Sequence, residues 1–423
     1  MNDETTLLVT VTGRDRPGIS ARLLSTLSVF PVTIVDLEQV VLAERLVLGA
    51  VLEVDERVAP GVSHHRVFEE VRNALDKTAI DLDMEVDYVS GGAQNRVNES
   101  SPAARLHVTV LADPLRPGAL GAITSCVARA GVNIDRIERL SSYPVTSVAM
   151  EISGAAGDAA RLARLRAELA MEAATQGVDV AVQPSGLHRR AKHLIVMDVD
   201  STLIQGEVIE LLAAHAGCEE EVARVTEQAM RGELDFEESL RRRVSLLKGL
   251  DAAAIAKVCE EIQLTPGART LIRTLKRLGY ECGIVSGGFT QITDVLVERL
   301  GLDYSAANTL EVVDGRLTGE LVGPIVDRKG KAVTLEQFAR EAGVPLEQVV
   351  AVGDGANDLD MLQTAGLGVA FNAKPVVRQQ ADTSVNVPYL DTIAFILGIT
   401  REEIEEADLH AEAEPVSTGR AGL

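Results

Sequence analysis

The sequence is poor in cysteine, in long apolar runs and in positive charge. It has four cysteines, which are far apart and form no Cys-x-x-Cys pair: Cys126, Cys218, Cys259 and Cys282. We interpret them as small buried residues in a reducing compartment. No run of about eighteen apolar residues occurs, so no membrane-spanning helix is expected. The formal net charge of −22 argues against nucleic acid and anionic membranes as main partners, because both are negatively charged.

Composition is otherwise that of a globular protein. Hydrophobic residues make up 46% of the 423 residues and charged residues 25%, so two to four domains with their own cores are expected. The first residues, Met1 to Glu4, are acidic and lack the basic and apolar segments of a secretory signal. We therefore expect a cytoplasmic protein.

The first half of the chain contains one pattern of strands and helices twice. In the first copy, strands are predicted at 5–12, 33–42, 46–54 and 81–89, and helices at 19–29 and 67–77. This βαββαβ order is the ferredoxin-like arrangement. The turn Arg16-Pro17-Gly18 recurs 100 residues later as Arg116-Pro117-Gly118. Two domains are therefore predicted, at 4–90 and 104–182, with a linker between them.

The Arg-Pro-Gly turns have two interpretations. Proline fixes φ and glycine tolerates positive φ, so a turn without any ligand would explain them. The duplicated pattern, however, resembles tandem ACT domains, which commonly bind amino acids where two copies meet and use a glycine at this turn. That resemblance implies that Gly18 and Gly118 approach a regulatory ligand closely, and that the chain forms a homodimer or a higher homo-oligomer.

The second half is organised around a short apolar run that ends in two carboxylates. Residues 194–197 are apolar and are followed by Asp198, Asp200, Ser201 and Thr202. The run predicts a strand buried on both faces, as in a parallel sheet. Ligands bind beyond the carboxyl ends of such strands. A helix cap would explain one of these polar residues but not all four.

Two later strands are predicted to end in polar groups as well. Residues 282–285 precede Ser286 and Gly287, and residues 349–352 precede Gly353 to Asp358. Strands alternating with helices predict a doubly wound parallel sheet over 185–402, with a helical cap at about 207–264. The acidic residues 403–423 are predicted to form a disordered tail.

Four carboxylates are expected at this sheet edge: Asp198, Asp200, Asp354 and Asp358. Two like charges about 4 Å apart repel each other by about 4 kcal/mol, so either protons or a cation must be present. Carboxylate oxygens together with a substrate phosphate are the ligands that Mg²⁺ favours. Lys331, near the start of a predicted helix, would add a positive charge for an anionic substrate.

These motifs, in this order, resemble those of the haloacid dehalogenase superfamily and, in finer detail, its phosphoserine phosphatase family. The finer match rests on Glu207, nine residues after Asp198, and on residues 236–244. The resemblance implies a phosphoric monoester hydrolase that releases serine from O-phospho-L-serine, the last step of L-serine biosynthesis. Serine, as the product, is then the natural ligand of the duplicated domains.

The resemblance also implies roles for individual residues. Asp198 is expected to be the nucleophile and Asp200 the general acid and base, which divides hydrolysis into two steps through an aspartyl-phosphate. The remaining expectations are Asp198, Asp200 and Asp354 for the metal, with Asp358 behind them; Ser286, Gly287, Lys331 and Asn357 for the phosphoryl group; Glu207 for the substrate ammonium; and Arg243 for its carboxylate. Lys329 is the alternative to Lys331, which the family spacing favours.

Two other functions stay open at this stage. One is a phosphatase for another small monoester, such as phosphohomoserine, or for a protein phosphoresidue. The other is a sensor whose Asp198 is phosphorylated but barely hydrolysed, with the N-terminal pair as effector; Asp200 argues against it. A fragment that begins near Ser185 is expected to keep the phosphatase chemistry and to lose any response to serine.

Overall fold

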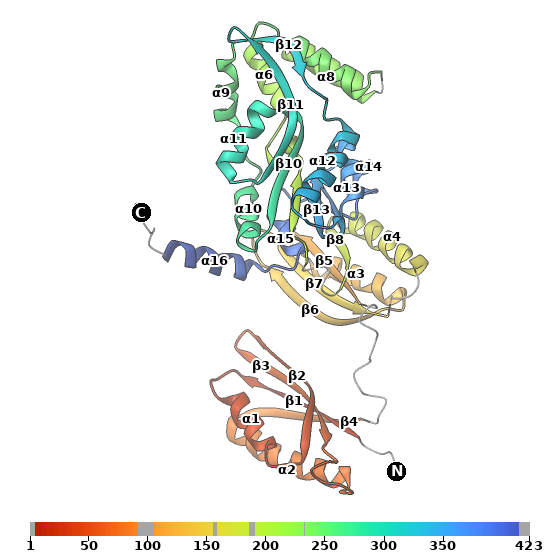
Figure 1. Cartoon of the computed structure of the whole chain (residues 1–423). Coiled ribbons are helices and arrows are strands. Elements are labelled where there is room, and N and C mark those ends of the chain that lie inside the picture. The colour runs from red at the N-terminus through yellow and green to blue at the C-terminus, as the bar shows by residue number, and fades with distance from the viewer. Residues whose placement is uncertain (1–4, 92–104, 155–158, 186–190, 232, 414–423) are drawn as a thin grey trace. The chain divides into compact units, whose positions relative to one another are not determined.

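The computed structural model describes residues 5–91, 105–154, 159–185, 191–231 and 233–413 (Figure 1). Its contacts divide the chain into two compact units, residues 1–99 and residues 100–423. Each unit is described here by itself. Within the described residues, no helix is both long and apolar enough to cross a membrane.

The first unit is a four-stranded antiparallel sheet with two helices. Its elements, in chain order, are β1 (Thr6–Arg14), α1 (Ile19–Leu27), β2 (Val32–Leu42), β3 (Arg45–Val54), α2 (His64–Leu82) and β4 (Met84–Gly91). The strand order is β2-β3-β1-β4. Leu7, Val9 and Val11 alternate into the core of this unit, together with Phe68 from α2. Helix α2 extends to Leu82, so the predicted strand at 81–89 begins too early.

The second unit opens with the same βαββαβ order. Its elements are β5 (Leu106–Ala112), α3 (Pro117–Arg129), β6 (Asn133–Ser141), β7 (Thr146–Ser153), α4 (Ala159–Gln176) and β8 (Asp179–Pro184). The strands β8, β5, β7 and β6 are neighbours in that order, all antiparallel. The predicted βαββαβ repeat is therefore present twice, once in the first unit and once at the start of the second.

A parallel sheet follows, in the order β10-β9-β13-β14-β15. Its strands are β9 (Leu194–Met197), β10 (Glu281–Phe289), β13 (Val349–Gly353), β14 (Leu367–Phe371) and β15 (Thr383–Val385). Helices α10 (Ala268–Arg277) and α11 (Thr290–Leu300) cover one face, and α12 (Arg328–Glu341) and α13 (Leu359–Thr364) the other (Figure 1). Because both faces are covered, β9 and β13 consist of fully buried residues. The predicted α/β fold class is confirmed.

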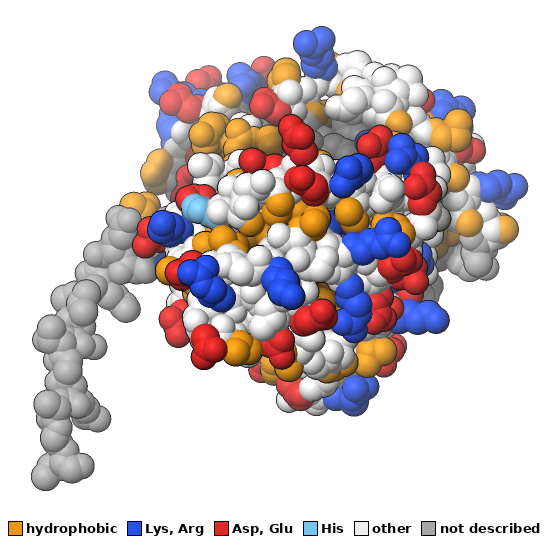
Figure 2. Space-filling view, turned by 90° about the horizontal axis from the view of Figure 1, so that it is seen from above, with side chains coloured by type: hydrophobic (Ala, Val, Ile, Leu, Met, Phe, Trp, Pro, Cys, Tyr) orange, Lys and Arg blue, Asp and Glu red, His pale blue; other side chains and the backbone are white. Residues whose placement is uncertain are grey.

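A helical cap is inserted between β9 and α10. The short turn η3 (Val199–Leu203) leads into α6 (Val208–Ala216), α7 (Glu219–Met230), α8 (Phe236–Ser245) and α9 (Ala253–Glu261). The hairpin β11 (Tyr304–Val313) and β12 (Arg316–Val322) supports the cap, since Gly249 N donates to Leu317 O at 2.8 Å. Acidic and basic side chains are interspersed over the face in Figure 2, which is the cap end of the molecule.

The second βαββαβ repeat and the parallel sheet are joined edge to edge. Strand β15 pairs with β8 at Thr383 and Ala181, so one sheet of eleven strands runs through the second unit. Asp179 accepts hydrogen bonds from the backbone N and the Nδ2 of Asn386, at 2.6 and 2.5 Å. The domain bounds predicted at 104–182 and 185–402 therefore fall inside one compact unit.

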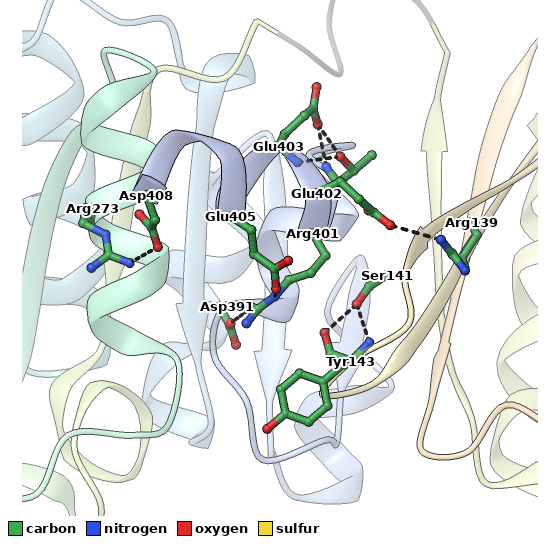
Figure 3. A network of polar contacts seen from close by, with 11 residues as sticks. Arg139, Ser141, Tyr143, Arg273, Asp391, Arg401, Glu402, Glu403, Glu405 and Asp408 are labelled. Atoms are coloured by element: carbon green, nitrogen blue, oxygen red, sulfur yellow. Dashed lines mark hydrogen bonds and ion pairs between the residues drawn. The ribbon is translucent and has the colours of Figure 1, made fainter. Parts of the chain in front are cut away.

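The last helix is α16 (Arg401–Ala413). The predicted disordered tail at 403–423 is therefore wrong for residues 403–413, which are helical, and residues 414–423 lie outside the described residues. Arg139 of β6 pairs with Glu402 at 3.1 Å, and Arg401 pairs with Asp391 at 3.1 Å (Figure 3). Asp408 binds Arg273 of α10 (Figure 3). The acidic composition suggested disorder, but these ion pairs hold the helix against the neighbouring elements.

Candidate active site

Asp198 lies at the carboxyl end of β9, where its backbone N donates to Val352 O at 2.9 Å. Its side chain is buried, with 3% exposure. Beyond it the chain turns sharply, because Ser201 has a φ of +58°. That turn brings Asp200 back toward β10 and the start of α6, so both carboxylates of the motif face the same edge of the sheet.

A buried lysine neutralises part of this edge. Lys331 Nζ donates to Asp198 Oδ1 at 2.5 Å and to Asp358 Oδ1 at 2.6 Å, and the lysine is 1% exposed. Burial alone would lower the pKa of Lys331, but its attraction to the two carboxylates outweighs burial and raises it. Lys329, two residues earlier on α12, is exposed. Of the two lysines considered for the phosphoryl group, Lys331 therefore lies at this edge and Lys329 does not.

Asp200 is held by two donors from different elements. Val208 N donates to its Oδ1 at 2.8 Å, and Ser286 Oγ donates to its Oδ2 at 3.1 Å. Burial raises the pKa of Asp200, as it does that of Asp198. An acid with a raised pKa and a fixed orientation is suited to giving and taking a proton.

The described residues contain one group of carboxylates suited to a metal ion: Asp198, Asp354 and Asp358, whose ligand atoms lie within 4.8 Å of one another. Burial, followed by repulsion from Asp358, raises the pKa of Asp354 to about 6. A divalent cation would relieve this repulsion, and oxygen ligands fit Mg²⁺. Asp200, which the sequence also suggested as a ligand, lies outside this group, and its carboxylate is already held by Val208 and Ser286.

The loop at the end of β10 is fixed by hydrogen bonds and by the cap. Gly288 N donates to Ser286 Oγ at 2.7 Å, and the ring of Phe236 covers Gly287 so closely that a Cβ there would lie 3.0 Å from Cζ. Asn308 of β11 fixes this loop, since its Nδ2 donates to Gly287 O at 2.8 Å and its Oδ1 accepts from Val326 N at 2.8 Å. No sequence motif pointed to Asn308, which is buried in β11.

One cavity of about 520 Å³ lies between the sheet edge and the cap. Asp198, Asp200, Gly287, Asp354 and Asn357 line its floor, and Glu207, Phe236 and Arg243 line the cap side. Ser286 and Lys331, which were also predicted to bind the phosphoryl group, are not among the lining residues but contact Asp200 and Asp198, which are. Glu210 and Lys374 also line the cavity, although no sequence motif pointed to either.

The cap side carries a pair of opposite charges. Burial, followed by repulsion from Asp200 and Asp354, raises the pKa of Glu207 to about 7. Burial lowers the pKa of Arg243, and attraction to Glu207 opposes the change. Ser201 Oγ donates to Glu207 Oε1 at 3.3 Å. A ligand with both an ammonium and a carboxylate complements this pair.

The two glycines predicted at regulatory sites lie far along the chain from this cavity. Gly18 precedes α1 with a φ of +94°, which favours glycine, and Gly118 lies in the first turn of α3. A Cβ built at either position meets no described atom within 4 Å. Both turns therefore leave their backbone open to a small ligand.

Comparison with known proteins relates these parts to families. Residues 195–363 match the haloacid dehalogenase-like hydrolase family, and residues 5–89 and 105–183 each match an ACT domain family. A phosphoserine phosphatase of Streptomyces coelicolor is 57% identical over 97% of this chain and 96% of its own length. One of Mycobacterium tuberculosis is 49% identical over 96% of this chain and 97% of its own length.

A solved structure extends the comparison to the fold. The unliganded form of a probable phosphoserine phosphatase from Vibrio cholerae is 35% identical and superposes with a TM-score of 0.57. The matched region covers 73% of this chain and 91% of the Vibrio cholerae chain.

Proposed function

Because the chain belongs to the phosphoserine phosphatase family, we propose that it is a Mg²⁺-dependent enzyme that hydrolyses O-phospho-L-serine to L-serine and phosphate. This reaction is the last step of L-serine biosynthesis. The observation that carries the proposal is one cavity that joins Asp198 and Asp200 to Glu207 and Arg243. A phosphoryl group at one end and an amino-acid head group at the other match these two sets of residues.

In the first step, a carboxylate oxygen of Asp198 attacks phosphorus. The bond between phosphorus and the serine oxygen breaks, and its electron pair stays on that oxygen, which takes a proton from Asp200. The donors that hold Asp200 support this role, because Val208 N and Ser286 Oγ fix the direction of its carboxyl group.

In the second step, water attacks the phosphorus of the aspartyl-phosphate. Asp200, now a carboxylate, takes a proton from that water, and the bond between Asp198 and phosphorus breaks to release phosphate. A neighbouring general base makes the intermediate short-lived, which favours a phosphatase over a phosphorylated sensor.

The buried charges of the site serve the phosphoryl group. Asp198, Asp200 and Asp354 are proposed to hold Mg²⁺, which when bound would neutralise charge on the phosphoryl oxygens. The grouping of Asp198 and Asp354 with Asp358 supports this proposal. Lys331 favours the ionised form of Asp198, against the effect of burial, and is proposed to add a positive charge beside the phosphoryl group. Ser286, Gly287 and Asn357 are proposed to donate hydrogen bonds to its oxygens.

Regulation, assembly and location belong to the same proposal. Serine is proposed to bind at the turns of Gly18 and Gly118 and to regulate turnover, and the chain is proposed to act as a homodimer or a higher homo-oligomer. ACT domain matches over residues 5–89 and 105–183 support an amino-acid ligand. Four free cysteines are compatible with a reducing cytoplasm.

Phosphate release from O-phospho-L-serine, with Mg²⁺ and with EDTA, tests the proposal. Turnover is expected only with the metal, and it should far exceed turnover of phosphohomoserine or a phosphoserine peptide, which alter the free head group or its distance from phosphorus. Equal turnover of all three substrates would favour another monoester as the natural substrate. A stable aspartyl-phosphate without turnover would favour the sensor.

A further inference from the structure

Helix α8 of the cap has two chemically different faces. On its outer face, Glu237 pairs with Arg241 at 2.9 Å and Glu238 with Arg242 at 2.6 Å. These pairs are spaced one turn apart, as expected for a solvated helix surface. The inner face lines the cavity with four side chains: Phe236, Ser239, Leu240 and Arg243. Its polar groups are therefore those of Ser239 and Arg243.

Both inner-face groups have hydrogen-bonding capacity that the free protein does not use. Ser239 is 2% exposed, and its hydroxyl has no hydrogen-bond partner among the described residues. The buried Nε of Arg243 has no partner among the described residues either. Because residues four apart lie on the same side of a helix, the two donors are neighbours.

An unpaired buried hydroxyl is unfavourable, because it has lost its hydrogen bonds to water and has no protein partner that replaces them. A serine inside a helix ordinarily satisfies its hydroxyl with a carbonyl of the preceding turn. Here Asp235 O accepts from the backbone N of Ser239 at 3.0 Å, and the hydroxyl stays unpaired. The position is thus ready for a group that enters the cavity.

A carboxylate fits this position best. It has two acceptor oxygens, while Ser239 and Arg243 each offer a donor from adjacent turns. Glu207 and Glu210, also on the cap side, would repel a carboxylate, so a second donor beside Arg243 would hold it away from them. An ammonium, in contrast, is attracted to Glu207.

We propose that Ser239 is a specificity-determining residue that donates a hydrogen bond to the substrate carboxylate, next to Arg243. The inference rests on the proposed function and extends it to a residue that lies within the matching segment 236–244 but was assigned no role there. Ser239 and Arg243 together select a free amino-acid head group over a monoester that lacks a carboxylate.

Ser239→Ala tests the proposal, with O-phospho-L-serine and phosphoethanolamine as substrates. Phosphoethanolamine keeps the ammonium and lacks the carboxylate. We expect KM for O-phospho-L-serine to rise roughly tenfold at unchanged kcat, and KM for phosphoethanolamine to stay the same. Equal increases for both substrates, or no increase for O-phospho-L-serine, would overturn the proposal.

Thermal unfolding separates binding from a structural role. Alanine is the best helix former, and the hydroxyl has no partner to lose, so Tm of Ser239→Ala should equal or exceed that of the parent. A Tm several degrees lower would mean that the hydroxyl stabilises the fold, which contradicts the proposal.

Ser245→Ala is the matched control on the same helix. Its exposed hydroxyl donates to Arg242 O at 2.7 Å, so neither KM should change. If the parent protein does not hydrolyse O-phospho-L-serine at all, the proposed function itself fails. If the parent does and Ser239→Ala loses no selectivity, only the role of Ser239 fails.

Discussion

Replacing Lys331 by alanine should destabilise the protein far more than any surface change. The substitution removes the ammonium that bridges Asp198 and Asp358, at 2.5 and 2.6 Å, and leaves two carboxylates buried with 3% and 0% exposure. Breaking a buried ion pair by removing one partner costs about 3–5 kcal/mol. At about 2 °C per kcal/mol for a unit of this size, Tm should fall by roughly 6–10 °C.

The measurement is thermal unfolding with EDTA present, so that no bound cation replaces the missing charge. Lys329→Ala is the control, because Lys329 lies on the same helix and is exposed; its Tm should stay within about 1 °C of the parent. Lys331→Ala combined with Asp358→Asn should recover part of the loss, since one of the two unpaired charges is then removed.

The fall in Tm caused by Lys331→Ala should also depend on pH. Without Lys331 the pKa of Asp198, already raised by burial, would rise further above its unfolded value. A carboxyl with a raised folded pKa stabilises the fold fully below its unfolded pKa and loses that contribution as pH rises through the folded pKa. The difference in Tm between the parent and Lys331→Ala should therefore increase from pH 5 to pH 8. A Tm for Lys331→Ala within about 2 °C of the parent, or an equal fall for Lys329→Ala, would refute the reasoning.

Four further outcomes are expected. Asp198→Asn should reduce phosphate release to background while Tm is retained, and clear residual turnover would contradict the nucleophile assignment. Arg243→Ala should raise KM for O-phospho-L-serine roughly ten- to hundredfold and change that for phosphoethanolamine little; equal losses would make Arg243 structural. Lowering pH from 8 to 6 protonates Glu207, whose pKa is about 7, so KM should rise in the parent and stay flat in Glu207→Gln. Gly118→Val, at a position where a Cβ would meet no described atom within 4 Å, should abolish any effect of serine on turnover, measured with and without serine; an unchanged response would place the effector elsewhere.

The sequence was most informative where apolar runs end in polar motifs. Residues 194–197 and 349–352 form the central buried strands, and the carboxylates that follow them meet at one edge. Such runs are determined by burial on both faces, which is a local property of the chain. The same reasoning located the duplicated βαββαβ units and the cap.

It was least informative where a residue's function depends on distant partners. Asn308 stands among small residues of a strand, and only the fold brings it to Gly287 O and Val326 N. Ser239 resembles any polar residue of a surface helix until the cavity is known. Helix α16 has the acidic composition of a disordered segment, and its anchoring by Arg139 and Arg273 comes from elements far away in the chain (Figure 3).

The pairing of β8 with β15 has a consequence for the edge of the parallel sheet. Strand β15 would otherwise end the parallel sheet and expose unpaired backbone N–H and C=O groups, which are a template for aggregation. Residues of the second repeat, Leu111, Leu140 and Ala181 among them, also pack into the same apolar cluster as the strands that carry the active site. A fragment that begins at Ser185, which is expected to keep the phosphatase chemistry, would expose both and should be more prone to aggregation than the full chain. Removal of residues 1–99 leaves this edge covered and isolates the first repeat's contribution to any serine response.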